Sequence, residues 1–408
     1  MAFKTANNKP SMTADGIPYI WTSTGGDVVT TATALSMYYD STYTTTYMGY
    51  GLSVGSGLIA FNASENNGIQ GGKIWVSSMN KLSVPSFYIN CPITQSNDNF
   101  GTSIAINSGR IITGQPGYAG PSYSYSFQGR AYMWDQSGNL VATIENPLAT
   151  TYCYFGACVA AGNGIFVVSA APQPGLARNV GQVYIYNKTG VLQKTITDPG
   201  NAIANCFGSS VAVSCGRLVI LSPGNYRLYV YDLAGNLINT ITAPSGAVYF
   251  GQRNSYSNPL SVGSGRIVVG DYGYNNRSGR YHIYDLNCNL IRTIAPSVPN
   301  GLSFGSSTAI GSGRIVIGAP GNNSIAGVVY VFDLDGNLIT SISDTQAQQA
   351  GSPYNYWGTN VAVQLGVIVI SSPNYGYDLS GFNGHGKVVT YKTGYNFTPY
   401  DAIDLTYG

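Results

Sequence analysis

The sequence predicts an all-β fold, a seven-bladed β-propeller of four-stranded antiparallel blades. Two observations carry this prediction: a Gly that follows a large apolar residue recurs along the chain, and each such pair opens the same order of short apolar segments and turns. The pairs lie 43 to 55 residues apart, which suits one four-stranded blade, and a steady period is the signature of a repeat fold. The pairs begin at Met48, Phe100, Phe155, Phe207, Phe250, Phe304 and Trp357.

The strands of one copy can be followed best in residues 304–343. A first strand of small residues at 307–310 leads through a Gly-rich turn into an Ile- and Val-rich strand at 314–317. A short apolar run bounded by Gly is typical of a strand covered on both faces. The third strand alternates with aromatic residues, Tyr330 and Phe332 in this copy, and this period of two indicates a strand rather than a helix.

The turn between the third and fourth strands is the best-defined loop of the repeat. It runs from Asp333 to Asn337, with close copies at 135–139 and 232–236. The Asp side chain can accept hydrogen bonds from turn amides, and the Gly before Asn takes the left-handed position. In the fifth copy Cys288 stands where the others have Gly, so we expect that turn to be strained or shifted by one residue.

A closed ring is predicted rather than an open stack of sheets. A four-stranded sheet with two apolar faces must pack on a neighbour at each face, and an open stack would need polar copies at its ends. No such copies are evident, and the Gly, Ser, Ala and Thr of the first strands suit a crowded central channel. Closure therefore joins the first copy to the seventh.

Residues 1–46 do not match the repeat, so we predict an N-terminal extension at 1–46 and the propeller at 47–408. Residues 17–21 and 28–31 read as strands, and the seventh copy loses the standard turn after its third strand. A segment of residues 17–46 could complete this last blade. Alternatively, the extension covers one face of the ring, and both possibilities remain open.

The repeat resembles the FG-GAP family of β-propellers. Phe304-Gly305 and Gly318-Ala319-Pro320 carry the two halves of that motif, and copies two to four keep Phe-Gly while their second half varies. The calcium-binding loop of some members is replaced here by Ser-Gly-Arg or similar residues, so no calcium site is implied. The Gly-Ser-Gly-Arg-Ile-Val form looks most like FG-GAP proteins of tailed phages of marine bacteria, and this resemblance implies a virion or tail-associated protein.

Composition excludes several classes of function. Only 9% of residues are charged and the net charge is +2, which favours neither a nucleic-acid partner nor an anionic membrane. No run is apolar for the ~18 residues of a membrane span, and we expect no signal peptide, because the first residues lack a cationic start followed by an apolar run. The protein would then be made in the host cytoplasm and located in the virion.

The six cysteines lack metal or disulfide spacing and are expected to be free thiols.

Candidate catalytic residues are few. Of the two histidines, His282 takes the place of an aromatic residue of the third strand, and His385 lies in a Gly-rich loop. Asp271 follows the second strand of copy five, and Asp378 is its only plausible carboxylate partner, two blades away. We expect no metal, no cofactor and no catalytic group, with Asp271 serving either in structure or in ligand binding.

The loops between the second and third strands are the candidate binding surface. They vary most in length and emerge from one face of the ring, and they combine Tyr with Asn, Ser and Gly, a composition typical of binding loops. Alternatively, Tyr is only abundant everywhere, with 33 in the chain. The candidate ligand-binding residues are Tyr118, Tyr123, Tyr125, Asp271, Tyr272, Tyr274, Tyr375, Tyr377 and Asp378.

Three functions remain open at this point. The first is a non-enzymatic virion component that docks to other virion proteins or presents Tyr-rich loops to a host surface glycan or receptor. The second is a free lectin-like adhesin, which a secretion signal would favour. The third is a polysaccharide-acting enzyme, which would need clustered acids that the sequence does not offer.

Overall fold

The structure of the protein is a computed structural model. The structure describes residues 19–23, 29–36, 46–65, 72–79, 85–95, 98–120, 127–148, 151–171, 180–253, 257–296, 301–322, 325–344, 356–373 and 386–393. For residues 19–23, 29–36 and 46–48, and for a few strand ends, only the backbone is described.

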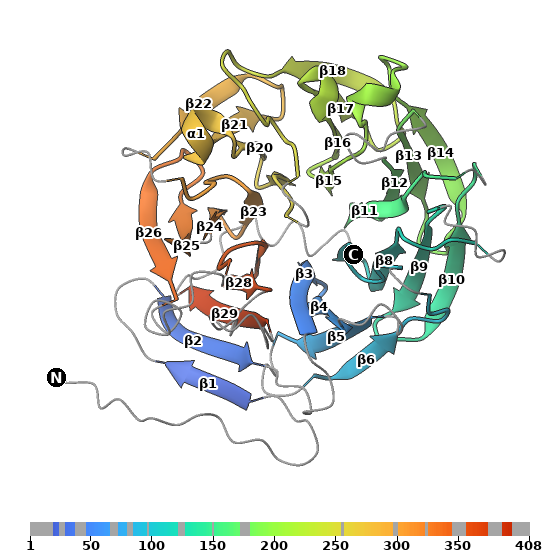
Figure 1. Ribbon diagram of the computed structural model, residues 1–408, viewed down its shortest axis with the longest axis horizontal. Helices are drawn as coiled ribbons and strands as arrows, with labels where there is room; N and C mark the ends of the chain where they lie inside the picture. The colour runs from blue at the N-terminus through green and yellow to red at the C-terminus, as the bar shows by residue number, and fades with distance from the viewer. Residues whose placement is uncertain are drawn as a thin grey trace.

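Seven antiparallel sheets stand around a central axis, as Figure 1 shows, and the predicted seven-bladed β-propeller is confirmed. Blade 1 comprises β3 (Thr46–Gly55), β4 (Leu58–Glu65), β5 (Lys73–Ser78) and β6 (Phe87–Asn90). Blade 2 comprises β7 (Ile104–Asn107), β8 (Arg110–Gln115), β9 (Arg130–Asp135) and β10 (Leu140–Glu145). Blade 3 comprises β11 (Phe155–Gly162), β12 (Ile165–Ala170), β13 (Gln182–Tyr186) and β14 (Leu192–Thr197).

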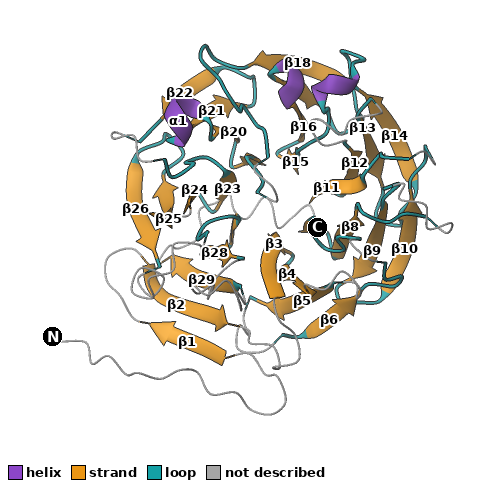
Figure 2. Cartoon of the chain, in the orientation of Figure 1, coloured by secondary structure: helices purple, strands orange, loops and turns teal. Residues whose placement is uncertain are grey.

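The next three blades repeat this plan. Blade 4 comprises β15 (Val211–Ser214), β16 (Arg217–Ser222), β17 (Arg227–Tyr231) and β18 (Leu237–Thr242). Blade 5 comprises β19 (Leu260–Gly263), β20 (Arg266–Asp271), β21 (Arg280–Asp285) and β22 (Leu290–Ile294). Blade 6 comprises β23 (Ser307–Gly311), β24 (Arg314–Asn322), β25 (Ile325–Phe332) and β26 (Leu338–Ser343). Helical turns are limited, in the described ranges, to η1 (Ile203–Asn205), η2 (Pro223–Asn225) and α1 (Tyr274–Arg277), drawn in purple in Figure 2.

Blade 7 combines strands from both ends of the chain. Its sheet order is β1-β2-β29-β28-β27, built from β27 (Val361–Gln364), β28 (Val367–Ser372), β29 (Lys387–Thr393), β2 (Val29–Ser36) and β1 (Tyr19–Ser23). The register of β2 on β29 places Leu35 opposite Val388. The fourth strand of this blade is thus β2, and β1 adds a fifth outside it (Figure 1). The division of the chain at residues 46 and 47 stays a prediction.

The core lies between the blades rather than in the middle of the ring. Seven clusters of buried hydrophobic side chains in the described part of the chain each join two neighbouring blades. The cluster that closes the ring packs Phe61 and Trp75 of blade 1 against Val369 and Val388 of blade 7. Asn360 of blade 7 adds hydrogen bonds from its Nδ2 to the carbonyl oxygens of Gly49 and Tyr50, at 3.3 and 2.9 Å.

Strand direction divides the turns between two faces of the ring. Because the four strands of a blade run antiparallel, the hairpins between strands one and two share a face with the turns between strands three and four, and we call it the hairpin face. The opposite face, which carries the other connections, is the crossover face. Both central residues of each first hairpin have positive φ, such as Ser264 (46°) and Gly265 (75°), which is the type I′ geometry.

The repeated arginines link neighbouring blades on the hairpin face. Arg266 of blade 5 donates from Nε to the carbonyl oxygen of Leu334 in the next blade and lies 3.4 Å from the Asp335 carboxylate. Arg110 of blade 2 donates likewise to the carbonyl oxygen of Lys188 in blade 3. The placement of these cations at one repeat position is therefore structural.

The Cys288 turn is strained but not shifted. Its N–H donates to the carbonyl oxygen of Asp285 at 3.0 Å, as Gly336 N–H does to Asp333 in blade 6. The expected shift by one residue is therefore wrong. The strain is confirmed, because Cys288 has a φ of 72°, a value that carries a steric cost for a residue with a Cβ.

Candidate functional site

The predicted binding residues divide into those the structure describes and those outside it. Tyr118, Asp271, Tyr272 and Tyr274 are described and lie on the crossover face, in blades 2 and 5. The remaining candidates lie outside the described residues: Tyr123, Tyr125, Tyr375, Tyr377, Asp378 and, with them, His385.

Asp271 is fully buried and its carboxylate is engaged on both oxygens. Oδ2 lies 3.0 Å from Arg280 Nε in an ion pair, and Oδ1 accepts backbone N–H bonds from Val248 and Tyr249 at 3.2 and 2.8 Å. These contacts join the end of β20 to the start of β21 and to the connection from blade 4. In this arrangement Asp271 holds a loop in place and presents no oxygen to a ligand.

The two tyrosines after Asp271 pack on the same support. The Arg280 guanidinium lies 4.0 Å from the centre of the Tyr274 ring, a cation–π contact. Tyr272 stacks on Tyr249 with ring centres 5.0 Å apart, and its burial raises the pKa of its phenol. The structure thus brings three of the predicted residues together, as a packed cluster rather than an open site.

Blade 2 repeats this cluster with different polar partners. Arg130 lies 3.9 Å from the Tyr118 ring centre, donates to its hydroxyl at 3.0 Å and lies 2.7 Å from Glu145. Gln115 takes the position of Asp271 and donates to Asp98 at 2.9 Å. Sequence reasoning missed the two arginines, although the signal was present: each tyrosine follows its second strand by three residues, and each arginine begins the third strand.

The described histidine is a core residue, as predicted. His282 lies opposite Val269, just as Tyr229 lies opposite Ile220 in blade 4. Its ring is 5.7 Å from that of Phe250 and its Nδ1 is 2.9 Å from the Thr293 hydroxyl. Burial lowers the pKa of His282 to about 3, so the imidazole is neutral and enclosed.

No group of three or more His, Cys, Asp or Glu side chains with the geometry of a metal site occurs in the described residues. No disulfide joins the six cysteines, and four of them are buried: Cys91, Cys153, Cys158 and Cys206. Among the described segments, no helix is long and apolar enough to cross a membrane.

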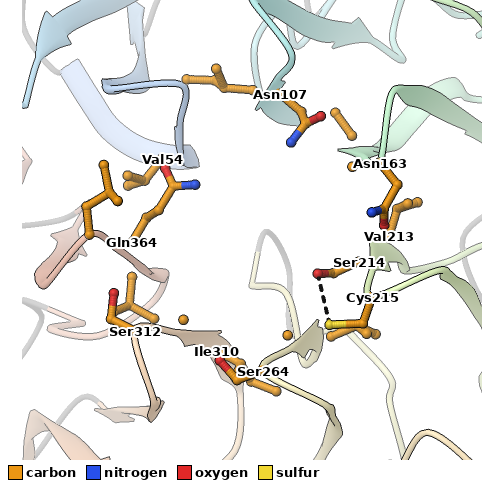
Figure 3. A pocket seen from close by; sticks show the side chains of 18 of the residues that line it. Val54, Asn107, Asn163, Val213, Ser214, Cys215, Ser264, Ile310, Ser312 and Gln364 are labelled. Carbon is orange, nitrogen blue, oxygen red and sulfur yellow. Dashed lines mark hydrogen bonds between the residues drawn. The ribbon is translucent and has the colours of Figure 1, made fainter. Parts of the chain in front are cut away.

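A hollow of the described structure lies on the opposite face, at the hairpin end of the central channel. This cavity, which we call the cup, has a volume of about 470 Å³ and takes its walls from the ends of the first strands and their type I′ turns (Figure 3). An inner layer is aliphatic, with Val54, Ile106, Val213, Val262, Ile310 and Val363. The polar layer comprises Asn107, Asn163, Ser214, Ser264, Ser312 and Gln364.

The lining of the cup is without charge. It holds amides, hydroxyls, apolar groups and the Cys215 thiol, and neither carboxylate, imidazole, amine nor guanidinium is among the described residues that line it. Sequence reasoning did not identify this cavity. The available signal was an Asn, Ser or Gln at or just before the left-handed position of most of the first hairpins.

An insertion at the start of blade 5 contacts other blades on the crossover face. The fifth copy has nine residues between Phe250 and the start of β19 at Leu260, whereas the sixth has two between Phe304 and β23. Arg253 donates to the carbonyl oxygen of Ala157 in blade 3 at 2.8 Å. Asn258 bonds Ser210 of blade 4 through its side chain and Thr308 of blade 6 through its backbone oxygen.

Comparison with known proteins supports the fold alone. No protein-family model matches the chain, and no curated protein matches its sequence. Matching solved structures include selenomethionine-substituted virginiamycin B lyase from Staphylococcus aureus, with a TM-score of 0.59, 8% identity, and coverage of 88% of this chain and 98% of that one. This likeness shows a shared seven-bladed propeller, and a propeller is compatible with a catalytic or a binding role.

Proposed function

We propose that this chain is a non-enzymatic binding and structural protein of a tailed-phage particle. The non-enzymatic part of this proposal rests on one observation, which is that charged side chains of the described residues are engaged in ion pairs that stabilise the fold. Ion pairs of the described residues serve the fold: Asp271 with Arg280 and Lys387 with Asp344, the latter at 2.9 Å, are buried on both sides, and the buried Arg130 holds the exposed Glu145. General acid–base catalysis most often uses an imidazole or a carboxyl group placed against the substrate, and the described residues that line the cup include neither.

The binding part of the proposal is supported by the ring itself. Seven packed interfaces hold the loops of both faces on a common frame, and such a frame positions binding loops accurately. Partners of this kind of module are other virion proteins, and a glycan or receptor of the host surface. The phage particle enters through the resemblance of the repeat to FG-GAP proteins of tailed phages, and location in the virion follows from it.

Labelling of purified particles tests the particle assignment. Antibody against the recombinant chain, coupled to gold, is expected to mark one fixed position on the head or tail of the phage that encodes it. Particles of an unrelated phage serve as the control. Absence of label, with the chain found only free in the lysate, would replace the virion component by the free adhesin.

A depolymerisation assay tests the non-enzymatic assignment separately. The recombinant chain is incubated with host surface polysaccharide, and new reducing ends and new double bonds are measured over time. We expect the rate of the buffer control. A rate that depends on protein concentration would make the chain an enzyme.

A further inference from the structure

We propose that the cup on the hairpin face is a binding site for an uncharged sugar residue at the end of a glycan, with N-acetylated sugars included. This inference rests on the binding role proposed above and not on the phage particle. It also moves the ligand site from the tyrosine-rich crossover face to the opposite face of the ring.

The absence of charge among the described lining residues favours a neutral ligand. An anionic sugar or a phosphate would lose its hydration on entering the cup and would find no cation there, since the described lining residues are all uncharged. Burial of an ion without a partner is strongly unfavourable. A neutral polyol loses less on transfer and can regain its hydrogen bonds from side chains.

The donors and acceptors of the polar layer define what the ligand must offer. Asn107 accepts from the Ser108 hydroxyl through Oδ1, and Asn163 accepts from Gly216 N–H, so within the described residues the Nδ2 groups of both amides keep donors for a ligand. Figure 3 shows the Asn107 amide nitrogen and the Ser214 hydroxyl directed toward the middle of the cup. Gln364 Oε1 is a buried acceptor for which the described structure offers no donor.

Sugar hydroxyls match this set because each one both donates and accepts, and an acetamido group adds a carbonyl acceptor and an N–H donor. The C–H faces of a sugar ring can lie on the aliphatic layer below, formed by residues such as Val213, Val262 and Ile310. The volume of about 470 Å³ lies within the range of small-molecule sites.

Contacts at the crossover end favour the end of a chain over its middle. Arg253 and Asn258 bond to blades 3, 4 and 6 there, so we expect a glycan to enter the cup from the hairpin face. The tyrosines of the crossover face are less suitable in their described part. Tyr118 and Tyr272 are 4% and 8% exposed, which leaves no free ring face for a sugar to stack on.

Isothermal titration and saturation-transfer NMR of the full chain test this site. The probes are glucose, galactose, mannose, N-acetylglucosamine and N-acetylgalactosamine, compared with glucuronic acid and N-acetylneuraminic acid. We expect saturable binding of at least one neutral sugar and none of the acidic pair. Preference for an acidic sugar, or no binding of any neutral sugar, would overturn the proposal.

Variants locate the binding. Ser214→Trp fills the cup and Asn107→Leu removes a donor at nearly constant volume, and each should weaken neutral-sugar binding about tenfold or more, the equivalent of ~1.4 kcal/mol. Tyr226→Ala, an exposed residue on the crossover face, is the matched control and should bind as the parent does. Binding that persists in Ser214→Trp, with its melting temperature unchanged, would place the sugar elsewhere and refute the site.

The two proposals fail separately in these experiments. Particles that carry the label while no variant or parent binds a sugar would keep the virion role and reject the cup. Sugar binding that maps to the cup, without any label on particles, would keep the site and reject the virion role.

Discussion

At the scale of single residues, the first hairpins place seven non-glycine side chains at positive φ. Asn tolerates this region better than most residues, and Asn-Gly is a preferred pair of a type I′ turn. Asn163 occupies the position in blade 3 at a φ of 49°, whereas Cys215 occupies it in blade 4 at 52° and Leu365 in blade 7 at 50°. The blades therefore differ in backbone strain at equivalent positions.

Replacement of Cys215 by Asn should stabilise the protein by about 0.5–1 kcal/mol, because the left-handed position then holds a residue that accepts it. Chemical unfolding at neutral pH measures the change, with the melting temperature as a second readout. The reciprocal variant Asn163→Cys should lose a similar amount. Equal stability of all three proteins would show that these turns store no strain.

His282 makes the fold sensitive to acid. Burial lowers its folded pKa to about 3, below the value of about 6.5 expected in the unfolded chain. The unfolded state therefore binds the proton first, so stability is complete above pH 6.5 and is lost as the pH falls toward 3. Other blades have Tyr at this position, such as Tyr229 in blade 4. His282→Tyr should therefore reduce the loss of unfolding free energy between pH 7 and pH 4 by about 2–3 kcal/mol.

Urea unfolding of both proteins across this pH range measures that difference. We expect equal free energies of unfolding at pH 7 and a smaller decrease for the variant as the pH is lowered. If the free energy of unfolding of the two proteins falls equally with pH, the buried neutral imidazole is contradicted. Thr293→Val, which removes only the Nδ1 contact, serves as the control.

At the scale of elements, ion pairs with similar distances have different consequences. Asp271 and Arg280 are 0% and 8% exposed in their side chains, whereas Asp335, paired with Arg266, is 74% exposed. Asp271→Asn leaves a buried guanidinium without its counter-charge and should cost about 3 kcal/mol or more. Asp335→Asn should cost less than about 0.5 kcal/mol.

Thermal unfolding of these two variants measures the contrast. The pair also tests the role of Asp271, since a loop anchor lowers stability when it is changed. A variant Asp271→Asn that melts with the parent would return this carboxylate to the list of ligand-binding candidates.

The repeated elements could be predicted because the same local signals recur along the chain. The Phe-Gly opening, the Ile- and Val-rich second strand and the Asp-to-Asn turn each recur in most copies, and neighbouring copies confirm one another. The burial of Asp271 and Tyr118 could not be predicted in this way. It depends on Arg280 and Arg130, which begin the next strand and meet their partners only after the loop has closed.

The cup was missed for a related reason. Six of the seven copies contribute one or two polar residues to the described lining, such as Asn107 or Ser312, which alone read only as turn formers. They form one cavity only because closure of the ring brings hairpins that are distant in sequence to the same end of the central channel. Sequence reasoning about single loops favours long and aromatic ones, and therefore pointed to the opposite face.

At the scale of the whole molecule, the ring depends on a blade assembled from both ends of the chain. Deletion of residues 1–46 removes β1 and β2 and exposes the outer edge of β29. We expect the melting temperature to fall by more than about 5 °C, and the unfolding transition to broaden as blade 7 loosens. Differential scanning calorimetry measures both effects.

A shorter deletion, of residues 1–16, keeps both strands and is the matched control for that experiment. A melting point unchanged by the longer deletion would show that the extension does not contribute to closure. A loss shared equally by both deletions would assign the effect to the first residues instead.

The construction of blade 7 also sets an order of events during synthesis. The fourth strand of the blade, β2, leaves the ribosome early, but its partner β29 ends only at Thr393, so the two are joined late. Until then six blades form an open arc whose first and last sheets expose apolar faces. Pairing between strands so far apart in the sequence slows folding and exposes nascent chains to aggregation. A growing chain of this protein is thus expected to need protection by chaperones until its last strand has emerged.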